Sequence, residues 1–325
     1  MNKKLNEFKI SELLGIQYPI IVAPMFLVSN TQMVIAAINA GATGAIPALN
    51  YRTSGELRQS IREVKKNAGG PIGINLIVNK SNFKYKEQLQ ICCEEKVDFI
   101  ITSLGSPKET IIEARKAGVK VFCDVTDLNY ALKVQALGAD AIIAVNNQAG
   151  GHAGNLSPQE LIPMLKKNCA IPVISAGGAG NGKELKSIAD LGADGFSMGS
   201  IFIASDEAGV SEEYKKACVE YGAKDIVMTT KLSGTPCTVI NTPYVAKIGT
   251  NQNWFETFLN KNKRLKKWFK TLTFYKGMKS LEKAAFSATY KTVWCAGPSI
   301  EHVKSIKPLK DIIAKLVSEY SKNND

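Results

Sequence analysis

The sequence predicts an α/β protein that folds as a (β/α)8 barrel, or TIM barrel, with an appended, mostly helical lid segment after the eighth strand. Three observations support this prediction. Eight short apolar runs follow one another, amphipathic stretches separate them, and a glycine often stands between such a stretch and the next run. Eight β-then-α units with short connections are typical of a closed parallel barrel. A doubly wound open sheet is the structural alternative.

The eight apolar runs are the predicted strands. They are rich in β-branched residues and almost continuously hydrophobic, as expected for strands that are buried on both faces. They span residues 19–24, 43–49, 71–78, 97–102, 119–124, 139–145, 171–176 and 195–199.

The stretches between these runs predict helices. Residues 53–66, 128–137 and 183–191 carry apolar positions at helical spacing. A glycine just past a helix adopts the left-handed C-cap conformation without strain, which fits the glycines that precede many strands. Leu-Gly-Ala-Asp occurs at 137–140 and again at 191–194, and we interpret it as one repeated structural unit rather than a functional motif.

The regular pattern stops after the eighth run, which predicts three parts. We expect a ligand-binding barrel over residues 1–224, a lid or cap segment of the same domain over 225–298, and a C-terminal helix packing on the barrel over 299–325. The lid segment interleaves basic and aromatic residues, namely Lys261, Lys263, Arg264, Lys266, Lys267 and Lys270 with Trp254, Phe255, Phe258, Trp268 and Phe269. The preferred interpretation is that its aromatic side chains pack on the barrel. Binding of single-stranded nucleic acid or of a membrane surface is the alternative.

Composition is that of an ordinary globular protein. The chain has 325 residues, of which 45% are hydrophobic, and 41 Lys and Arg against 29 Asp and Glu give a net charge of +12. We interpret this charge as Lys-rich, solvated helix faces, so we expect no nucleic-acid and no membrane partner. No apolar run reaches the ~18 residues of a spanning helix, and the polar segment 1–12 lacks the apolar core of a signal peptide.

Seven cysteines without a C-x-x-C spacing argue against a disulfide framework and a structural zinc site. A reducing, cytoplasmic location fits better. Two histidines and scattered acidic residues do not make a metal site either.

Ligands of such barrels bind at the carboxyl ends of the strands, so the residues found there are the candidates. The first strand ends in Ala23-Pro24-Met25, where proline fixes the turn and removes a donor. The third strand carries Asn75 within an apolar run. A buried amide needs a partner, and two interpretations stay open, an internal cap or a hydrogen bond to the polar edge of a ring.

The sixth strand leads into Ala149-Gly150-Gly151-His152-Ala153-Gly154. Paired glycines let a backbone approach a ligand closely, and a histidine exchanges protons near neutral pH. A loop histidine without a role is the alternative. The position at a strand end, beside Gly150 and Gly151, makes His152 the candidate catalytic residue, whereas His302 near the C-terminal helix is interpreted as structural.

The seventh and eighth strands end in the Gly-containing runs Ala176-Gly177-Gly178 and Met198-Gly199-Ser200. In barrels, loops at these two places commonly hold a phosphate, with amide groups as donors. Gly177 to Glu184 nearly matches a P-loop, but Glu184 replaces the required Ser or Thr, so we reject that motif.

Taken in order, Ala23-Pro24-Met25, Gly73-Ile74-Asn75, the loop around His152, Ala176-Gly177-Gly178 and Met198-Gly199-Ser200 resemble the nitronate monooxygenase family, formerly called 2-nitropropane dioxygenases. The resemblance covers about residues 10–320. The family also includes FMN-dependent enoyl-acyl carrier protein reductases of the FabK type and some NAD(P)H:quinone reductases.

The resemblance implies a barrel that binds FMN noncovalently. Ala23, Pro24 and Met25 would line the flavin ring, and Asn75 would hydrogen-bond the ring or the ribityl chain. The phosphate would be held by the glycine loops, with Gly150, Gly151, Ala176, Gly177, Gly178, Met198, Gly199 and Ser200 as cofactor-binding residues. His152 would serve as the base toward nitroalkanes, or as a donor that positions an anionic nitronate.

One departure from the family pattern concerns charge. Gln148 stands where members usually carry Glu, and Val145 and Asn146 replace a usual Gln or Glu followed by Gly. Losing a nearby anion lowers the pKa of a histidine. Asp124, at the end of the fifth strand, is a further candidate to face the flavin, without an assigned role.

The expected function is that of an FMN-dependent oxidoreductase, a nitronate monooxygenase-like enzyme with O2 as co-substrate. The alternative is an NAD(P)H-dependent FMN reductase of enoyl thioesters, as in FabK, or of quinones. A third hypothesis, from another class, is a flavin-binding or nucleic-acid-associated protein without turnover. A homodimer through the appended segment is a further expectation.

Overall fold

The computed structural model describes residues 4–79, 82–231, 236–250 and 293–323. The predicted closed parallel barrel is confirmed: eight strands pair in chain order, and β9 returns to β1, with Val22 opposite Met198. The strands are β1 (Ile20–Val22), β2 (Thr43–Pro47), β3 (Ile72–Ile77), β4 (Phe99–Ser103), β5 (Lys120–Val125), β6 (Ala141–Val145), β8 (Val173–Ala176) and β9 (Gly195–Met198).

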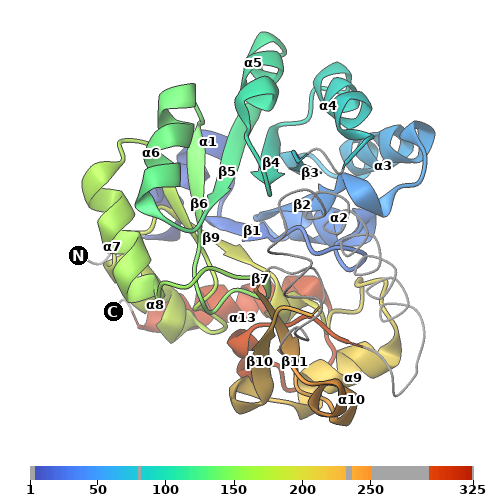
Figure 1. The fold of residues 1–325 in the computed structure, drawn as a ribbon, viewed down its shortest axis with the longest axis vertical. Coiled ribbons are helices and arrows are strands. Elements are labelled where there is room, and N and C mark those ends of the chain that lie inside the picture. Colours follow the sequence, from blue (N-terminus) through green and yellow to red (C-terminus); the bar gives the residue numbers. More distant parts are fainter. Residues whose placement is uncertain (1–3, 80–81, 232–235, 251–292, 324–325) are drawn as a thin grey trace, which may run out of the picture.

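Helices surround the barrel (Figure 1) and follow the amphipathic stretches of the sequence. They are α1 (Lys9–Leu14), α2 (Thr31–Asn39), α3 (Ser54–Asn67), α4 (Tyr85–Glu94), α5 (Lys108–Lys116), α6 (Leu128–Leu137), α7 (Pro158–Asn168), α8 (Gly182–Asp190), α9 (Glu212–Glu220), α10 (Pro243–Ile248) and α13 (Leu309–Lys322). Several begin at a side chain that caps the first turn; Thr53 and Glu56, for example, form a capping box at α3.

The barrel is filled by side chains and is closed at its amino end. Phe99 and Phe122 stack inside it with ring centroids 5.0 Å apart. Ile10 and Leu14 of α1 belong to the same buried cluster, and the Ile10 amide donates to Asp194 O at 3.2 Å. Because α1 plugs this end, a ligand has room only at the carboxyl end of the barrel.

Aspartates at the start of strands hold their neighbours in register. Asp98, Asp140 and Asp194 each accept a hydrogen bond from the backbone amide of an adjacent strand, at 2.7 to 2.9 Å. Two of them end the Leu-Gly-Ala-Asp repeats. The repeat is therefore structural, as predicted, because its carboxylate satisfies a backbone donor at the closed end of the barrel.

A second, three-stranded sheet lies beside the carboxyl end, in the order β10 (Ile226–Thr229), β11 (Cys237–Ile240) and β7 (Gly151–His152). β7 belongs to the stretch predicted as an irregular loop. That expectation was wrong for Gly151 and His152, because Thr238 and Cys237, far along the chain, pair with them. The basic and aromatic run of the predicted lid lies outside the described residues.

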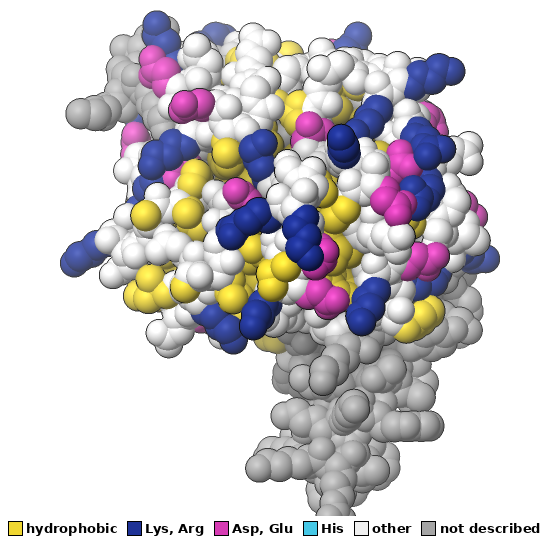
Figure 2. All heavy atoms as spheres, turned by 90° about the horizontal axis from the view of Figure 1, so that it is seen from above, with side chains coloured by type: hydrophobic (Ala, Val, Ile, Leu, Met, Phe, Trp, Pro, Cys, Tyr) yellow, Lys and Arg dark blue, Asp and Glu magenta, His cyan; other side chains and the backbone are white. Residues whose placement is uncertain are grey.

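The C-terminal helix α13 packs against α8, and Glu319 accepts a hydrogen bond from the Gly182 amide at 2.9 Å. On the face in Figure 2, Lys and Arg side chains alternate with Asp and Glu rather than forming one basic field. In the described part of the chain, no helix is long and apolar enough to cross a membrane.

Candidate active site

A cavity of about 1030 Å³ opens at the carboxyl ends of the barrel strands, and residues of β7, β11 and the segment 293–299 complete its lining. Its volume is at the upper end of the range for small-molecule sites. Of the residues predicted for the site, Gly178 does not line the cavity. The others do, namely Ala23, Pro24, Met25, Asn75, Gly150, Gly151, His152, Ala176, Gly177, Met198, Gly199 and Ser200.

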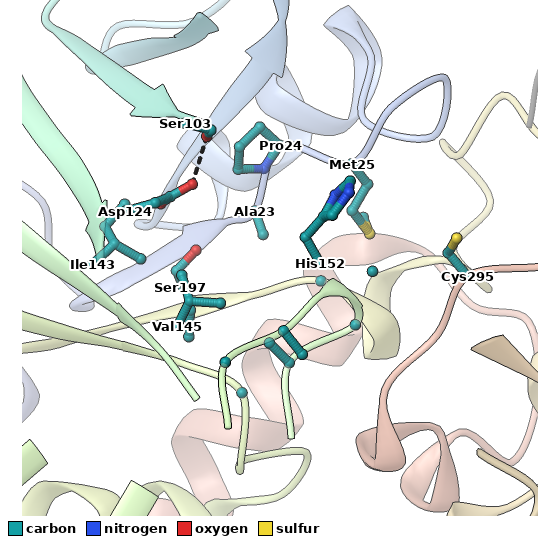
Figure 3. A pocket seen from close by; sticks show the side chains of 18 of the residues that line it. Ala23, Pro24, Met25, Ser103, Asp124, Ile143, Val145, His152, Ser197 and Cys295 are labelled. Atoms are coloured by element: carbon teal, nitrogen blue, oxygen red, sulfur yellow. Dashed lines mark hydrogen bonds between the residues drawn. The ribbon is translucent and has the colours of Figure 1, made fainter. Parts of the chain in front are cut away.

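The turn after β1 forms an apolar wall of this cavity (Figure 3). Ser29 fixes the turn, since its hydroxyl donates to Ala23 O at 2.6 Å and accepts from the Met25 amide at 3.0 Å. The Ala23 amide donates to Met198 O at 2.8 Å. These polar groups are thus satisfied within the chain, and Pro24 has no amide proton. The wall suits the face of a flat, apolar ring.

Side chains at the ends of β3, β4 and β5 form a hydrogen-bonded row in the cavity. Asn75 Nδ2 donates to Ile101 O at 3.1 Å and to Ser103 Oγ at 2.8 Å, and Ser103 Oγ donates to Asp124 Oδ2 at 2.5 Å (Figure 3). Asn75 is buried. Both protons of its amide are therefore used, and among the described residues no donor reaches Oδ1. Asn75 can only accept a hydrogen bond from a ligand.

Asp124 is a carboxyl group that sequence reasoning noticed without assigning a role. Burial raises its pKa from 3.8 to about 6, and the hydrogen bond from Ser103 offsets part of this shift. Its proton is consequently bound more tightly in the folded than in the unfolded chain. The contribution of Asp124 to stability is largest below its unfolded pKa and is lost as the pH rises through about 6.

Asp124→Asn is expected to stabilise the flavin-free protein at pH 8 by up to about 3 kcal/mol, the free energy of a shift of about two pKa units. At pH 4 most of the gain should be lost, because the carboxyl is then protonated in the folded state and partly protonated in the unfolded chain, whose pKa is 3.8. Urea unfolding of wild type and variant at the two pH values measures the difference. An equal gain at both pH values would contradict the assignment.

His152 projects from β7 into the cavity beside Met25 (Figure 3). β7 pairs with β11 so that Cys237 lies opposite His152, and Thr238 Oγ1 donates to Ala149 O at 2.7 Å. The ring is reached by solvent in the cavity, yet the protein around it restricts hydration and lowers the pKa of His152. The direction matches the expectation from Gln148, but the cause is desolvation. The lowered pKa favours the neutral ring of His152 at pH 7.

Asn146, which sequence reasoning recorded only as a departure from the family pattern, positions this loop. Its side chain is completely buried; Nδ2 donates to Gly177 O at 3.0 Å, and Oδ1 accepts from the Gln148 amide at 2.9 Å. One amide side chain thereby ties the loop before His152 to the loop after β8. No local signal in the sequence separates such a tie from any other loop asparagine.

The loops after β8 and β9 present backbone donors to the cavity. Ala179, Gly199 and Ser200 line it, their backbone amides donate to no other described residue, and the Gly178 amide is likewise unpaired within the described chain. The hydroxyl of Ser200 accepts from the Gly297 amide at 2.8 Å, which leaves its own proton for a ligand. Converging amides and a hydroxyl suit an anion such as a phosphate.

Two glycines make this arrangement possible. Gly177 has φ of +97°, and a Cβ there would lie 2.4 Å from Ala149 N. A Cβ at Gly150 would lie 2.6 Å from Ser200 Oγ. Side chains at either position would fill the space between the two loops. The residues present therefore fit the phosphate, and the apolar wall fits the ring, of a flavin mononucleotide.

Charged and thiol groups complete the lining. The described lining residues include Asp124, Asp127 and His152 but no Lys or Arg, and they include Cys237 and Cys295, which sequence reasoning did not place in the site. No group of three or more metal-binding side chains occurs among the described residues. His302 lies outside the cavity lining and bonds Glu184 at 2.9 Å; this is a structural contact, as predicted.

Comparisons of sequence and of structure relate this chain to known proteins. The family model for nitronate monooxygenase matches residues 7–84 and 79–319. The (3aS,4S,5R,7aS)-5-hydroxy-7a-methyl-1-oxo-octahydro-1H-indene-4-carboxyl-CoA dehydrogenase of Rhodococcus jostii is 30% identical over 75% of this chain and 68% of that protein. A probable nitronate monooxygenase of Staphylococcus saprophyticus is 28% identical over 74% of this chain and 80% of that protein. The structure of FabK from Thermotoga maritima superimposes with a TM-score of 0.84 at 28% identity, covering 97% of this chain and 96% of that one.

Proposed function

This chain belongs to the nitronate monooxygenase family of flavin-dependent oxidoreductases, and we propose that it uses FMN to oxidise alkyl nitronates with O2. The observation that carries the proposal is the position of His152 in the same cavity as the apolar wall and the residues whose amides are unpaired within the described chain. The redox chemistry would be that of the flavin, which accepts electrons from the substrate and passes them to O2.

The protein's own groups would hold cofactor and substrate. Ala179, Gly199 and Ser200 would hold the phosphate of FMN through amides and one hydroxyl, Ala23 and Pro24 would lie against the ring, and Asn75 Oδ1 would accept from it. The described lining residues include no Lys or Arg, so the backbone amides and the hydroxyl would be the donors to this phosphate. Backbone amides at strand ends are sufficient donors for such a group.

His152 would act on the substrate in one of two ways. A neutral imidazole has one acceptor nitrogen and one N–H donor. Toward a nitroalkane, the acceptor nitrogen would remove the proton from the carbon that carries the nitro group. Toward a nitronate, which has already lost that proton, the N–H would donate to the anionic oxygen. Proton removal requires the neutral ring, which desolvation favours, whereas donation to the anionic oxygen is possible from either protonation state.

The pH dependence of turnover follows from the lowered pKa of His152. For a nitroalkane, kcat/KM should fall on the acid side with a midpoint below 6.5, the ordinary value, because only the neutral ring accepts the proton. The corresponding nitronate is the control, since it needs no proton removal. Initial rates of nitrite release across the pH range measure both profiles. An acid limb with a midpoint above 6.5 would contradict a desolvated base.

The identity of the cofactor is tested by releasing it from the purified protein. Heat denaturation followed by chromatography and mass spectrometry should give stoichiometric FMN, and aerobic incubation of the intact protein with a nitronate should release nitrite. We call the amides of Ala179, Gly199 and Ser200, which are unpaired within the described chain, together with the Ser200 hydroxyl, the phosphate cradle. Release of FAD or riboflavin, or a colourless protein, would count against the phosphate cradle as a site for a terminal phosphate.

The similarity to FabK over 97% of this chain favours a second candidate, an NAD(P)H-dependent FMN reductase of enoyl thioesters; quinones are further acceptors for such a reductase. It would share the ring wall and the phosphate cradle. The two candidates differ in what reduces the flavin, which is a direct observable.

We also propose a cytoplasmic location, supported by seven cysteines that are all unbridged. The division into residues 1–224, 225–298 and 299–325, the absence of nucleic-acid and membrane partners, and a homodimer through the appended segment stay predictions. Most of that appended segment lies outside the described residues.

A further inference from the structure

Two thiols of the cavity, Cys237 and Cys295, lie with their sulfurs 3.7 Å apart. They come from sequence positions 58 residues apart. We propose that these cysteines form a redox-sensitive pair, which a peroxide converts to a disulfide beside His152 and a thiol reductant restores.

The strands bring the pair next to the candidate catalytic residue. Cys237 begins β11 opposite His152 of β7, and directly opposed residues of antiparallel strands project to the same face. Cys295 joins this sheet through an isolated antiparallel bridge to Val239. Cys237 and Cys295 are therefore diagonal neighbours, within reach of each other but not directly opposed.

Closing the bond requires movement of the segment around Cys295. A disulfide needs about 2.05 Å between sulfurs and a Cα separation usually below about 7 Å, so the sulfurs must approach each other. The segment is held by hydrogen bonds: Tyr214 Oη donates to Cys295 O at 2.5 Å, the Ile240 amide donates to Trp294 O at 2.9 Å, and the Gly297 amide donates to Ser200 Oγ at 2.8 Å. Movement at Cys295 would thus reach the hydroxyl of Ser200 in the phosphate cradle.

The exposures of the two thiols assign their order of reaction. Cys295 is partly exposed in the cavity, whereas Cys237 is buried, and the neighbouring Cys295 thiol together with burial raises the pKa of Cys237 well above its ordinary value. Hydrogen peroxide would oxidise Cys295 to a sulfenic acid, with release of one water. Cys237 sulfur then attacks the Cys295 sulfur, and its proton leaves with the hydroxyl group as a second water.

Peptide mapping tests the bond directly. The reduced flavin-containing protein is treated with hydrogen peroxide, its remaining thiols are alkylated, and it is digested with trypsin. Cleavage after lysines gives peptides 232–247 and 292–304, each with one cysteine. We expect these two peptides joined, with a mass two hydrogens below their sum, and separated again by dithiothreitol. Cys295→Ser should abolish the joined peptide, whereas Cys169→Ser, outside the cavity lining, should leave it.

The functional consequence is measured on the same samples. Nitronate turnover of the wild-type protein should fall several-fold after peroxide and recover with dithiothreitol, and the loss should track the yield of joined peptide. Peptides 232–247 that stay fully alkylated after peroxide would overturn the proposal, as would Cys295 ending as a sulfinic acid. The mapping needs no turnover, so its failure and a failure of the proposed function are separate results.

Discussion

Replacing His152 with alanine is expected to lower kcat/KM for a nitroalkane by about 10²–10⁴-fold, the usual contribution of a positioned general base, while the purified protein keeps its flavin. Alanine removes the nitrogen that accepts the proton. It leaves the apolar wall at Ala23 and Pro24, and the amides of Gly199 and Ser200, in place. Flavin absorbance per protein and initial rates of nitrite release measure the two effects separately.

His152→Gln is the matched variant that distinguishes the two roles of the ring. Glutamine donates and accepts hydrogen bonds but is not a base. Turnover of the nitroalkane should therefore be as low as in the alanine variant, whereas turnover of the nitronate should be partly retained. Wild-type rates in the alanine variant would remove His152 from the chemistry altogether.

Gly177→Ala is expected to weaken FMN binding by about 5- to 150-fold. The new Cβ would lie 2.4 Å from Ala149 N and 2.5 Å from Asn146 Oδ1, at φ of +97°. Overpacking of this kind costs about 1–3 kcal/mol, and about 1.4 kcal/mol corresponds to tenfold in affinity. The loop between β6 and β7 must move away from the loop after β8, which opens the phosphate cradle. Equilibrium titration of the flavin-free protein with FMN measures the loss.

Gly118→Ala is the control for backbone strain alone. Gly118 has φ of +74°, also in the left-handed region, but a Cβ there would meet nothing within 4 Å. This variant should lose some stability and bind FMN as the wild type does. Equal affinities for FMN in the Gly177 and Gly118 variants would show that the close approach of the two loops does not matter. Circular dichroism confirms that each variant is folded before titration.

The barrel could be predicted because strands that are buried on both faces need apolar residues at consecutive positions. Runs such as 139–145 and 171–176 are almost continuously apolar, and each contains a barrel strand. The residues at the strand ends followed from the same reasoning: once strands are parallel, their carboxyl ends meet at one place. Ala23, Asn75 and His152 therefore came together in one cavity as predicted.

Contacts between distant segments could not be predicted in this way. Gly151 and His152 pair with a strand more than 80 residues later, and two residues carry no strand periodicity of their own. The row from Asn75 through Ser103 to Asp124 depends on the relative register of β3, β4 and β5. The approach of Cys237 to Cys295 depends on a single bridge. Each is a consequence of tertiary pairing, which residue spacing does not encode.

Anaerobic mixing of the yellow protein with a nitronate, and separately with NADH and NADPH, tests the central claim most directly. We predict that the nitronate alone bleaches the oxidised-flavin absorbance rapidly, that the two nicotinamides do so far more slowly, and that admitting O2 restores the colour with release of nitrite. Rapid bleaching by NADH or NADPH, with no change on adding the nitronate, would contradict the proposed function and assign the cavity to the reductase chemistry instead.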